Sequence, residues 1–435
     1  MTLGRLTPLL VGQCPDDWQQ VFIDEVTELL TNGYVGPSLP YQTDDPVIGV
    51  RYLQGFNVRP NKIDFVNATW VTKEFHERNK KSHLCEGDLL VVQSGHIGTA
   101  AVVPEAATGS NCHALIINRF QRNKVDPYFV CQYINSEIGQ ARLRGLEVGS
   151  SMLHINTSEL GRFILPLPPL AEQRRLAEIL GTWDVAIEKA EQLIASKRRR
   201  NEVLSNRLLF GHARSGQRNT ETTRPLHWFS APSDWQVVVI GKAAREVSAP
   251  NGNDSDLPVL SCTKYDGLVD SLTYFDKQVF SHDTSKYKVV RHGQFAYATN
   301  HIEEGSIGYQ DLVPAGLVSP IYTVFQADAK MINDGYFYKL LKTEKLRQIF
   351  AAKTNSSVDR RGSLRWKDFA RIQIPLPPLD EQRQINAVLD DAKREISLLQ
   401  AEVKVLKTQK RGLMQKLLTG QWRVTIPTSK EASHA

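Results

Sequence analysis

The chain has 435 residues, too many for one ordinary core, and its 41% hydrophobic and 23% charged residues are normal for a globular protein. Its longest apolar runs have the length of core strands and its first residues lack a signal-peptide pattern, so we expect a cytoplasmic protein without membrane spans. Five scattered cysteines without C-x-x-C spacing argue against a disulfide framework and a structural zinc site, while the net charge of +6 permits nucleic acid as a partner.

The first domain is expected over residues 1–164. It begins with a strand in "PDDWQQVFI" (Pro15–Ile23), and strand-like runs such as "DLLVVQS" and "TAAVV" come after it. A short helix in "PYFVCQYINSEIGQARL" and a polar loop in "EVGSSMLHINTSE" come before the last strand. The domain is therefore predicted to be mostly β, with a little helix near its end.

A long helix is expected within residues 165–211, where the chain reads "LPLPPLAEQRR" at its start. The prolines end the preceding strand and prevent the helix from starting earlier, and no proline interrupts the rest of the segment. Apolar residues at alternating spacings of four and three form a heptad seam, which is typical of a helix that packs on another helix. The seam residues predicted to make this packing are Leu176, Leu180, Trp183, Ile187, Ile194, Leu204 and Leu208.

A basic stretch covers the end of this helix and the residues after it. Seven Lys or Arg residues and one acid, Glu202, lie between Lys197 and Arg218, a local excess of six that equals the net charge of the whole chain. The run Lys197–Arg200 is predicted to face either DNA phosphate or an acidic surface of a partner, and the sequence leaves both readings open.

The second half of the chain repeats this order. We expect a linker over residues 212–230, a second mostly-β domain over 231–373, a second long helix within 374–420 and a tail over 421–435. The helix starts at "IPLPPLDEQRQ", and Lys410 interrupts its apolar seam. The seam residues predicted to pack on another helix are Ile385, Leu389, Ile396, Leu399, Val403, Leu406, Leu413 and Leu417.

The two halves are a tandem duplication. Residues 165–211 align with 374–420 without a gap at an offset of 209, and eight of the first ten positions are identical. "PDDWQQVFI" likewise aligns with "PSDWQVVVI" (Pro232–Ile240), with six of nine positions identical. A period of about 210 residues indicates two domains of one fold, because solenoid repeats are far shorter.

Neither long helix can bury its seam inside a domain of about 150 residues, so the two helices are predicted to pack on each other. An antiparallel pair is favoured, because a parallel pair would crowd both domains at one end. The predicted fold class is α+β: two similar mostly-β domains separated by two long antiparallel coiled-coil helices, in a pseudo-twofold arrangement. The polar interruptions at Lys197–Asn201 and Lys410 are expected to help set the helix register.

These features together resemble the DNA-specificity subunits of type I restriction–modification systems. The resemblance covers nearly the whole chain and rests on "PLPPLxEQ" occurring twice, each time between a variable domain and a long helix. "GDLLVVQSGHIGTAAVV" (Gly87–Val103) is also similar to a strand–loop–strand of the family's target-recognition domains. Its counterpart "GQFAYATNHIEEGSIGY" (Gly293–Tyr309) departs from that pattern by an insertion.

The resemblance implies a non-catalytic subunit that reads an asymmetric, bipartite DNA site, one half with each recognition domain. It implies two modification subunits as partners, which bind S-adenosylmethionine and methylate adenine. It also implies restriction subunits that use ATP to translocate DNA. No cofactor is expected in this chain itself.

Polar loops are the expected DNA-contacting segments, because Arg, Asn and Gln read base edges while Lys, Arg, Ser and Thr contact phosphates. Ser150–Ser151 and Ser356–Ser357 occupy the same place in both copies, which favours a shared role in positioning the DNA backbone. The candidate DNA-contacting residues are Arg78, Lys80, Lys81, Ser94, His96, Ser150, Ser151, His154, Asn300, His301, Lys353, Asn355, Ser356, Ser357, Arg360, Arg361 and Arg365.

The sequence carries no convincing catalytic signature. The chain has no G-x-x-x-x-G-K-[ST] phosphate loop and no H-E-x-x-H spacing, so neither ATP hydrolysis nor a metal is predicted. "DPYF" (Asp126–Phe129) is read as a helix N-cap followed by Pro, and "EVK" (Glu402–Lys404) as part of the heptad helix. Two alternatives stay open: a self-contained DNA-modifying enzyme with an unrecognised site, and a two-headed coiled-coil scaffold.

Overall fold

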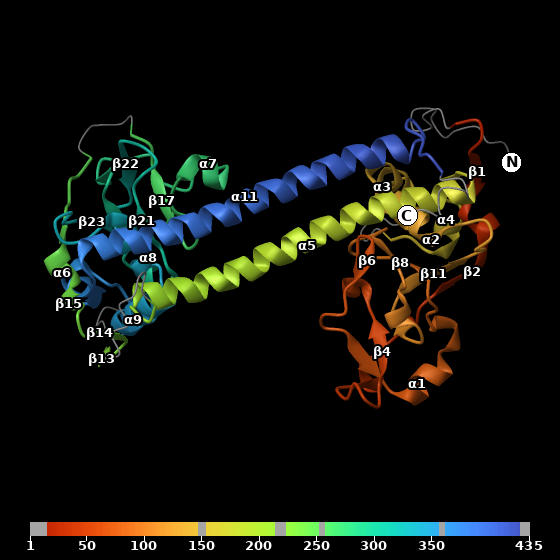
Figure 1. The fold of residues 1–435 in the computed structure, drawn as a ribbon, viewed down its shortest axis with the longest axis horizontal. Helices are drawn as coiled ribbons and strands as arrows, with labels where there is room; N and C mark the ends of the chain where they lie inside the picture. The colour runs from red at the N-terminus through yellow and green to blue at the C-terminus, as the bar shows by residue number, and fades with distance from the viewer. Residues whose placement is uncertain (1–14, 147–153, 214–222, 252–256, 356–361, 427–435) are drawn as a thin grey trace, which may run out of the picture. The chain divides into compact units, whose positions relative to one another are not determined.

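The computed structural model describes residues 15–146, 154–213, 223–251, 257–355 and 362–426. It divides into two compact units, unit 1 (Met1–Gln192 with Gln400–Ala435) and unit 2 (Leu193–Leu399). Each unit holds one mostly-β domain and one half of each long helix (Figure 1). The long helices are α5 (Leu170–Leu209) and α11 (Leu379–Leu417), within the two ranges predicted for them.

The described residues of unit 1 form two four-stranded sheets and two small two-stranded ones. One four-stranded sheet has the order β2-β11-β8-β9 and the other β10-β4-β7-β3, while β1 pairs with β12 and β5 with β6. The strands are β1 (Gln19–Phe22), β2 (Thr27–Asn32), β3 (Gln42–Thr43), β4 (Val50–Leu53), β5 (Val58–Arg59), β6 (Lys62–Ile63), β7 (Thr69–Val71), β8 (Leu89–Val92), β9 (Ala100–Val102), β10 (Asn111–Cys112), β11 (Leu115–Phe120) and β12 (Ile164–Leu167). The helices are α1 (Lys73–Arg78), α2 (Pro127–Asn135), α3 (Glu137–Arg144) and α4 (Thr157–Gly161), with 3-10 turns η2 (Ile23–Val26), η3 (Leu39–Tyr41), η4 (Gly55–Asn57), η5 (Lys80–Ser82) and η6 (Glu105–Ala107).

Unit 2 repeats the main sheet with the order β16-β23-β20-β21, again antiparallel throughout, and β15 pairs with β24 as β1 does with β12. The strands are β13 (Thr223–Pro225), β14 (Ser230–Pro232), β15 (Gln236–Val239), β16 (Ala244–Glu246), β17 (Leu260–Thr263), β18 (Gly267–Asp270), β19 (Lys288–Arg291), β20 (Phe295–Ala298), β21 (Ile307–Tyr309), β22 (Ala315–Val318), β23 (Tyr322–Ala327) and β24 (Gln373–Leu376). The helices are α6 (Ile240–Ala243), α7 (Ser271–Phe275), α8 (Asp334–Leu341), α9 (Glu344–Asn355) and α10 (Trp366–Phe369), with the 3-10 turn η7 (Ile302–Glu304).

Three local expectations differ from the structure. The short helix expected near the end of each domain is two helices, α2 and α3 in unit 1 and α8 and α9 in unit 2. Ser136 and Thr343 accept hydrogen bonds from the amides of Gly139 and Leu346, and each so begins a new helix. Residues 223–232 of the expected linker form the β13–β14 hairpin, and Phe229 packs into the core of unit 2. The first proline of each repeated phrase lies inside a strand, since Pro166 pairs with Gln20 in the β1–β12 ladder.

The predicted seams are the least exposed stripe of both long helices. Leu176, Leu180, Ile187, Ile194, Leu208, Ile385, Leu389, Val403 and Leu417 are buried, whereas Trp183, Leu204, Ile396, Leu399, Leu406 and Leu413 are half-buried. The helices run antiparallel within each unit, because Lys407 pairs with Glu191 and Lys410 with Asp184 in unit 1. Lys197 pairs with Glu395 in unit 2, at 2.6 Å. The predicted antiparallel helix pair is therefore confirmed.

The repeated phrase forms a buried joint between each domain and its helix. Gln173 is fully buried; its Oε1 accepts from the Asp126 amide at 2.8 Å, and its Nε2 donates to Pro168 O and Lys124 O at 2.8 and 3.0 Å. Gln382 makes the same three bonds in unit 2, to Asn333, Pro377 and Met331. In each unit one glutamine side chain therefore links the start of the long helix to the N-cap residue of an earlier short helix, Asp126 of α2 or Asn333 of α8.

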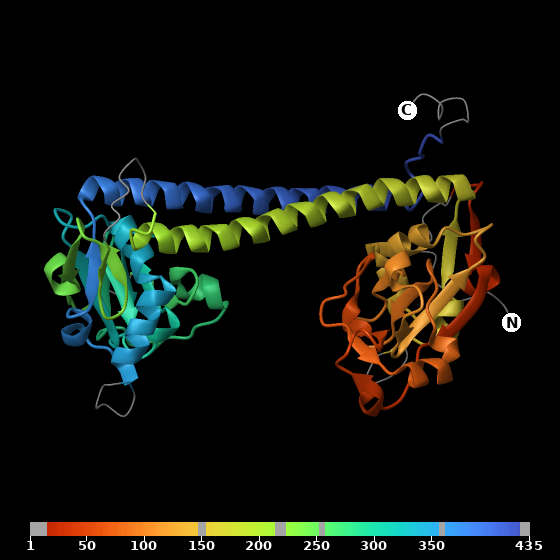
Figure 2. The same ribbon diagram turned by 60° about the horizontal axis from the view of Figure 1, so that its bottom comes forward.

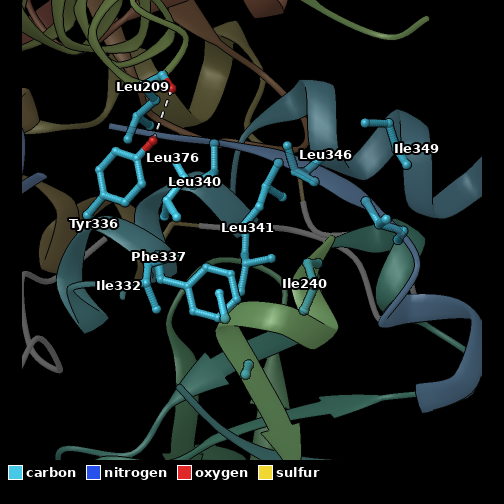
Figure 3. Packing of buried hydrophobic residues seen from close by; sticks show 14 of the residues in the cluster. Leu209, Ile240, Ile332, Tyr336, Phe337, Leu340, Leu341, Leu346, Ile349 and Leu376 are labelled. Carbon is cyan, nitrogen blue, oxygen red and sulfur yellow. Dashed lines mark hydrogen bonds between the residues drawn. The ribbon is translucent and has the colours of Figure 1, made fainter. Parts of the chain in front are cut away.

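Each domain is also closed by the far end of the other repeat's helix. A Cβ on Gly420, after α11, would lie 2.2 Å from Pro15 Cγ, and one on Gly211, after α5, would lie 2.3 Å from Pro232 Cγ. Both glycines have positive φ, so both the backbone conformation and the close approach require glycine. In the core of unit 2, the Tyr336 hydroxyl donates to Leu209 O at the end of α5 at 3.4 Å (Figure 3).

Candidate nucleic-acid interface

Two predicted segments of unit 1 meet at the end of its main sheet. The β8–β9 loop carries Ser94 and His96, both exposed, and the amide of Ile155 donates to Gln93 O at the start of this loop at 3.1 Å. This bond brings His154, also exposed, next to the loop. The sequence predicted both segments as contact regions, and the fold brings them together although they lie far apart along the chain.

An equivalent backbone contact between two loop segments, called a loop crossing below, occurs in unit 2. The amide of Leu364 donates to Thr299 O at 2.8 Å, and Leu364 stands 209 residues after Ile155, the offset of the repeat. Asn300 is half-buried and His301 exposed in the β20–β21 loop, and Arg365 is exposed beside Leu364. The duplicated fold therefore builds a polar surface from equivalent segments in each unit.

The remaining predicted residues fall into two groups. Lys353 is exposed on α9, and Asn355 ends that helix. Ser150, Ser151, Ser356, Ser357, Arg360 and Arg361 lie outside the described residues, as does the side chain of Asn355. Contact of all these residues with DNA stays a prediction.

Arg78, Lys80 and Lys81 belong to another part of unit 1. They lie on α1 and η5, beside the β10-β4-β7-β3 sheet, and Figure 1 shows α1 and β4 at the end of the unit remote from α5. All three are exposed, but Arg78 forms an i,i+4 pair with Glu74 at 2.5 Å, which offsets part of its charge. The structure does not bring these residues together with the β8–β9 loop. Figure 2 shows the domain of unit 1 from a second direction, on one side of the first half of α5.

Next to these lysines, two histidine rings stack. The His76 and His83 centroids lie 3.6 Å apart with an interplanar angle of 3°. Burial and the neighbouring His83 hold the pKa of His76 below its ordinary value of 6.5, against the opposing effect of Glu77. The fold therefore disfavours protonation of His76, and the exposed cations of this end of unit 1 include Arg78, Lys80 and Lys81.

A cavity of about 770 Å³ in unit 1 has the wrong charge for DNA. It lies between the β5–β6 hairpin, α2 and α5, where carboxylates outnumber cations. Its charged residues are Asp64, Asp126, Glu178, Asp184, Glu188, Glu191, Arg59, Lys62 and Arg174. Phosphates would be repelled there, so the loops at the sheet ends remain the better candidate interface.

No metal was predicted from sequence spacing, yet one group of donors in the described residues has suitable geometry. The ligand atoms of His301, Glu303 and Glu304 all lie within 4.8 Å of one another in the loop insertion of unit 2. His301 and Glu304 are exposed, and the His301 ring contacts the Glu304 carboxylate at 3.3 Å. A divalent cation could be held by this group, but its geometry is also that of an ordinary His–Glu pair.

Sequence reasoning missed two features of this interface. Tyr265, at the tip of the β17–β18 hairpin, is 79% exposed, and Lys264 Nζ lies 5.2 Å from its ring centroid. Lys342 lies in a stretch expected to be helical, so it was not among the candidate residues, although it contacts two loops of the polar surface. The Asp266–Gly267 pair is a hairpin signal that could have revealed the tip, whereas nothing local marks Lys342.

Comparisons with known proteins agree on one family. The family model described as the type I restriction modification DNA specificity domain matches residues 15–196 and 277–408. A putative type I restriction enzyme MjaX specificity subunit of Methanocaldococcus jannaschii is 24% identical over 95% of this chain and 96% of its own length. The described residues include no helix that is both long and apolar enough to cross a membrane.

Solved structures show the same fold. The S subunit of a type I restriction–modification system from M. genitalium aligns with a TM-score of 0.55 and 15% identity, over 95% of this chain and 99% of that one. A chain from a study of complex assembly and conformational transition of the type I R-M system aligns with a TM-score of 0.52 and 16% identity, over 94% of this chain and 100% of that one.

Proposed function

Because this chain belongs to the family of type I restriction–modification DNA-specificity proteins, we propose that it reads a bipartite, asymmetric DNA site, one half with each unit. It is the DNA sequence-specificity subunit of its system and works with DNA and the other subunits of a restriction–modification complex. The observation that carries the bipartite reading is the repeated loop crossing, Ile155 on Gln93 and Leu364 on Thr299.

The two crossings support an asymmetric site because they present different side chains. Unit 1 offers Ser94, His96 and His154, whereas unit 2 offers Asn300, His301 and Arg365. Base edges are distinguished by hydrogen-bond donors and acceptors, so different side chains on one scaffold select different bases. A palindromic site would instead be expected from two identical surfaces.

Catalysis is proposed to reside in the partner subunits. Membership of a specificity family implies a non-catalytic role for this chain. We further propose two modification subunits that bind S-adenosylmethionine and restriction subunits that use ATP, with no cofactor in this chain. Free thiols at Cys85, Cys112, Cys131 and Cys262 suit the cytoplasm, where such a complex would meet cellular DNA.

The test is reconstitution of this chain with its modification subunits, followed by mapping of adenine methylation. Methylation should appear at one bipartite sequence, and replacing residues 230–373 by the second domain of a relative should change one half-site only. Replacing the first domain is the matched control and should change the other half-site.

Other outcomes identify the alternatives. Methylation or cleavage of DNA by the purified chain alone would show a self-contained enzyme. Absence of salt-sensitive DNA binding, with and without partners, would show a scaffold, because phosphate contacts make affinity fall steeply with salt. A change in both half-sites after one domain replacement would contradict the assignment of one half-site to each unit.

A further inference from the structure

We propose that Lys342 is a positioning residue that joins two loops of unit 2 into one DNA-reading surface, with Tyr265 at its edge. The loops are the tip of the β17–β18 hairpin (264–266) and the β20–β21 loop (299–306). The inference rests on the proposed function, because it assigns residues to the reading of the second half-site.

The geometry of the Lys342 ammonium carries the inference. Its Nζ donates to Lys264 O at 2.8 Å, to Gly305 O at 2.9 Å and to Ile307 O at 3.3 Å. An ammonium group has three protons, so these three carbonyls use its full donor capacity. One carbonyl belongs to the hairpin tip, one to the end of the β20–β21 loop and one to the first residue of β21, which makes Lys342 a bridge between segments that lie far apart along the chain.

Core packing sets the position of Lys342. It caps α8 directly after the buried residues Leu340 and Leu341, and its Nζ lies 6.0 Å from the Tyr338 ring centroid. Burial lowers the pKa of Lys342, with Cys262 and Asp266 opposing this effect. A cation held against backbone carbonyls on a helix end is suited to fixing loops, since buried residues anchor the helix and three carbonyls hold the ammonium.

The two loops also lie close together. Gly305 has φ +97°, and a Cβ there would lie 3.5 Å from Lys264 O. On the hairpin side, a Cβ on Gly267, with φ +75°, would lie 2.3 Å from the Tyr338 hydroxyl. The hairpin is therefore pressed against α8, and Lys342 holds its tip beside the β20–β21 loop.

The joined surface presents groups that suit DNA. Tyr265 is 79% exposed at the hairpin tip, next to the Lys264 side chain, and His301 is exposed on the other loop. An exposed tyrosine offers a ring for contact with a base or sugar and a hydroxyl for hydrogen bonding, while a lysine binds phosphate. The Tyr274 hydroxyl donates to Asp266 Oδ2 at 3.3 Å and so supports the tip.

Unit 1 holds its equivalent loop in a different way. Gln140 on α3 donates from Nε2 to Gly98 O at 3.0 Å and to Ile134 O at 2.9 Å. Asn135 on α2 donates from Nδ2 to Asn61 Oδ1 in the β5–β6 turn and to Ala100 O at the start of β9. Neutral amides therefore tie the β8–β9 loop and the neighbouring turn to the helices of unit 1. Within the part of the chain that the structure describes, unit 1 uses neutral amides where unit 2 uses the Lys342 ammonium. Loss of the ammonium should therefore affect only the half-site read by unit 2.

The experiment uses the full chain assembled with its modification subunits. Lys342→Met keeps the length and apolar stem of the side chain but removes all three donors. Methylation is measured on a panel of sites with single base changes in each half. We expect the preference for the correct bases of one half-site to fall about tenfold, in line with the value of a base contact, and the other half-site to be read normally.

Three companion variants separate positioning from folding. Lys330→Met removes an exposed lysine of the same unit and should leave both half-sites unchanged. Lys342→Arg keeps a cation that can donate and should restore part of the preference. Tyr265→Ala alters only an exposed side chain, so it should weaken the same half-site with an unchanged Tm, and it decides the question should Lys342→Met fail to fold.

The results distinguish two failures. Normal discrimination at both half-sites in Tyr265→Ala and in folded Lys342→Met would overturn this inference while leaving the proposed function in place. Equal loss at both half-sites would also overturn it, because a general loss of stability does not select one half-site. Absence of any sequence-dependent methylation with the wild-type chain would overturn the proposed function and this inference with it.

Discussion

Lys410 shows how one side chain sets the pairing of the two long helices. The sequence marks it as an interruption of the apolar seam, and the structure places its side chain, 9% exposed, 2.5 Å from Asp184 Oδ1 and 3.2 Å from Gln132 Oε1. Gln132 Nε2 also donates to Asp184 at 2.6 Å, so helices α2, α5 and α11 share one polar cluster. A buried ion pair adds little net stability but strongly disfavours any register that leaves one charge alone.

Replacing Lys410 by Met should reduce the free energy of unfolding by about 1–3 kcal/mol, because Asp184 loses its cation in a partly buried place. The double variant Lys410→Met/Asp184→Leu should recover most of this loss, since no charge is then left alone. Urea unfolding of the three proteins measures the coupling. Additive losses in the double variant would show that the pair does not act as a unit.

A second prediction at this scale concerns the stacked histidines. The folded pKa of His76 is lower than its ordinary value of 6.5, so folding opposes its protonation. The stability contributed by the neutral ring is fully present above about pH 6.5 and is lost as pH falls through the lowered pKa. The Tm of the wild-type chain should therefore fall between pH 8 and pH 5, and the Tm of His76→Gln should fall by less. An identical slope for both proteins would contradict this assignment.

The elements meet at joints that the repeated phrase builds. Glu172 Oε2 accepts from Trp18 Nε1 at 3.3 Å and Glu381 Oε2 from Trp235 Nε1 at 3.2 Å, next to the buried glutamines of the same phrase. In unit 1 Arg423, from the expected tail, donates to both Glu172 and Asp17 at 2.7–2.8 Å. These bonds hold Asp17 and Arg423 ionised, so the pKa of Asp17 lies below and that of Arg423 above its ordinary value.

Gln173→Leu tests the joint. It leaves the Asp126 amide and the carbonyls of Lys124 and Pro168 without their partner, which should cost about 1–3 kcal/mol for each buried group that water cannot reach. Thermal unfolding should show a clear loss, and Gln382→Leu should behave alike. Gln400→Leu, at an exposed position on α11, is the control and should change Tm little. Equal Tm values for Gln173→Leu and the control would refute the role given to this glutamine.

At the scale of the whole molecule, the two units are expected to act independently on the two half-sites. Each loop crossing is formed by residues of one unit only. Perturbations of two surfaces without common partners add in free energy.

His96→Ala and Arg365→Ala should therefore each weaken one half-site, and their combined effect should equal the sum of the two. Competition binding of the assembled complex to DNA with each half-site altered measures this. His154→Ala should weaken the same half-site as His96→Ala, because one loop crossing brings the segments of both histidines together. A combined loss far from the sum would show that the units are coupled.

The sequence by itself determined the duplication, both long helices, the stripe by which they pack and their antiparallel pairing. The duplication follows from the alignment of the two halves, and the antiparallel pairing from the room that two domains need. The helices and their stripe follow from periodicity and proline placement, which act over a few residues and can be read without the fold. The α2 N-cap at Asp126 was read correctly for the same reason, since its side chain accepts from the amides of Tyr128 and Phe129. Helix breaks at Ser136 and Thr343 were missed, because an apolar face continues across them.

Only the tertiary structure decided which distant segments meet. The end of each long helix closes the other repeat's domain, through Gly211 and Gly420. The hairpin tip of unit 2 joins the β20–β21 loop through Lys342. Such contacts depend on the geometry of several elements at once, and a lysine in a helical pattern looks the same whether its ammonium meets solvent or three carbonyls. Local sequence patterns therefore predict the scaffold of this specificity subunit, whereas its reading surfaces form only when distant segments meet in the folded chain.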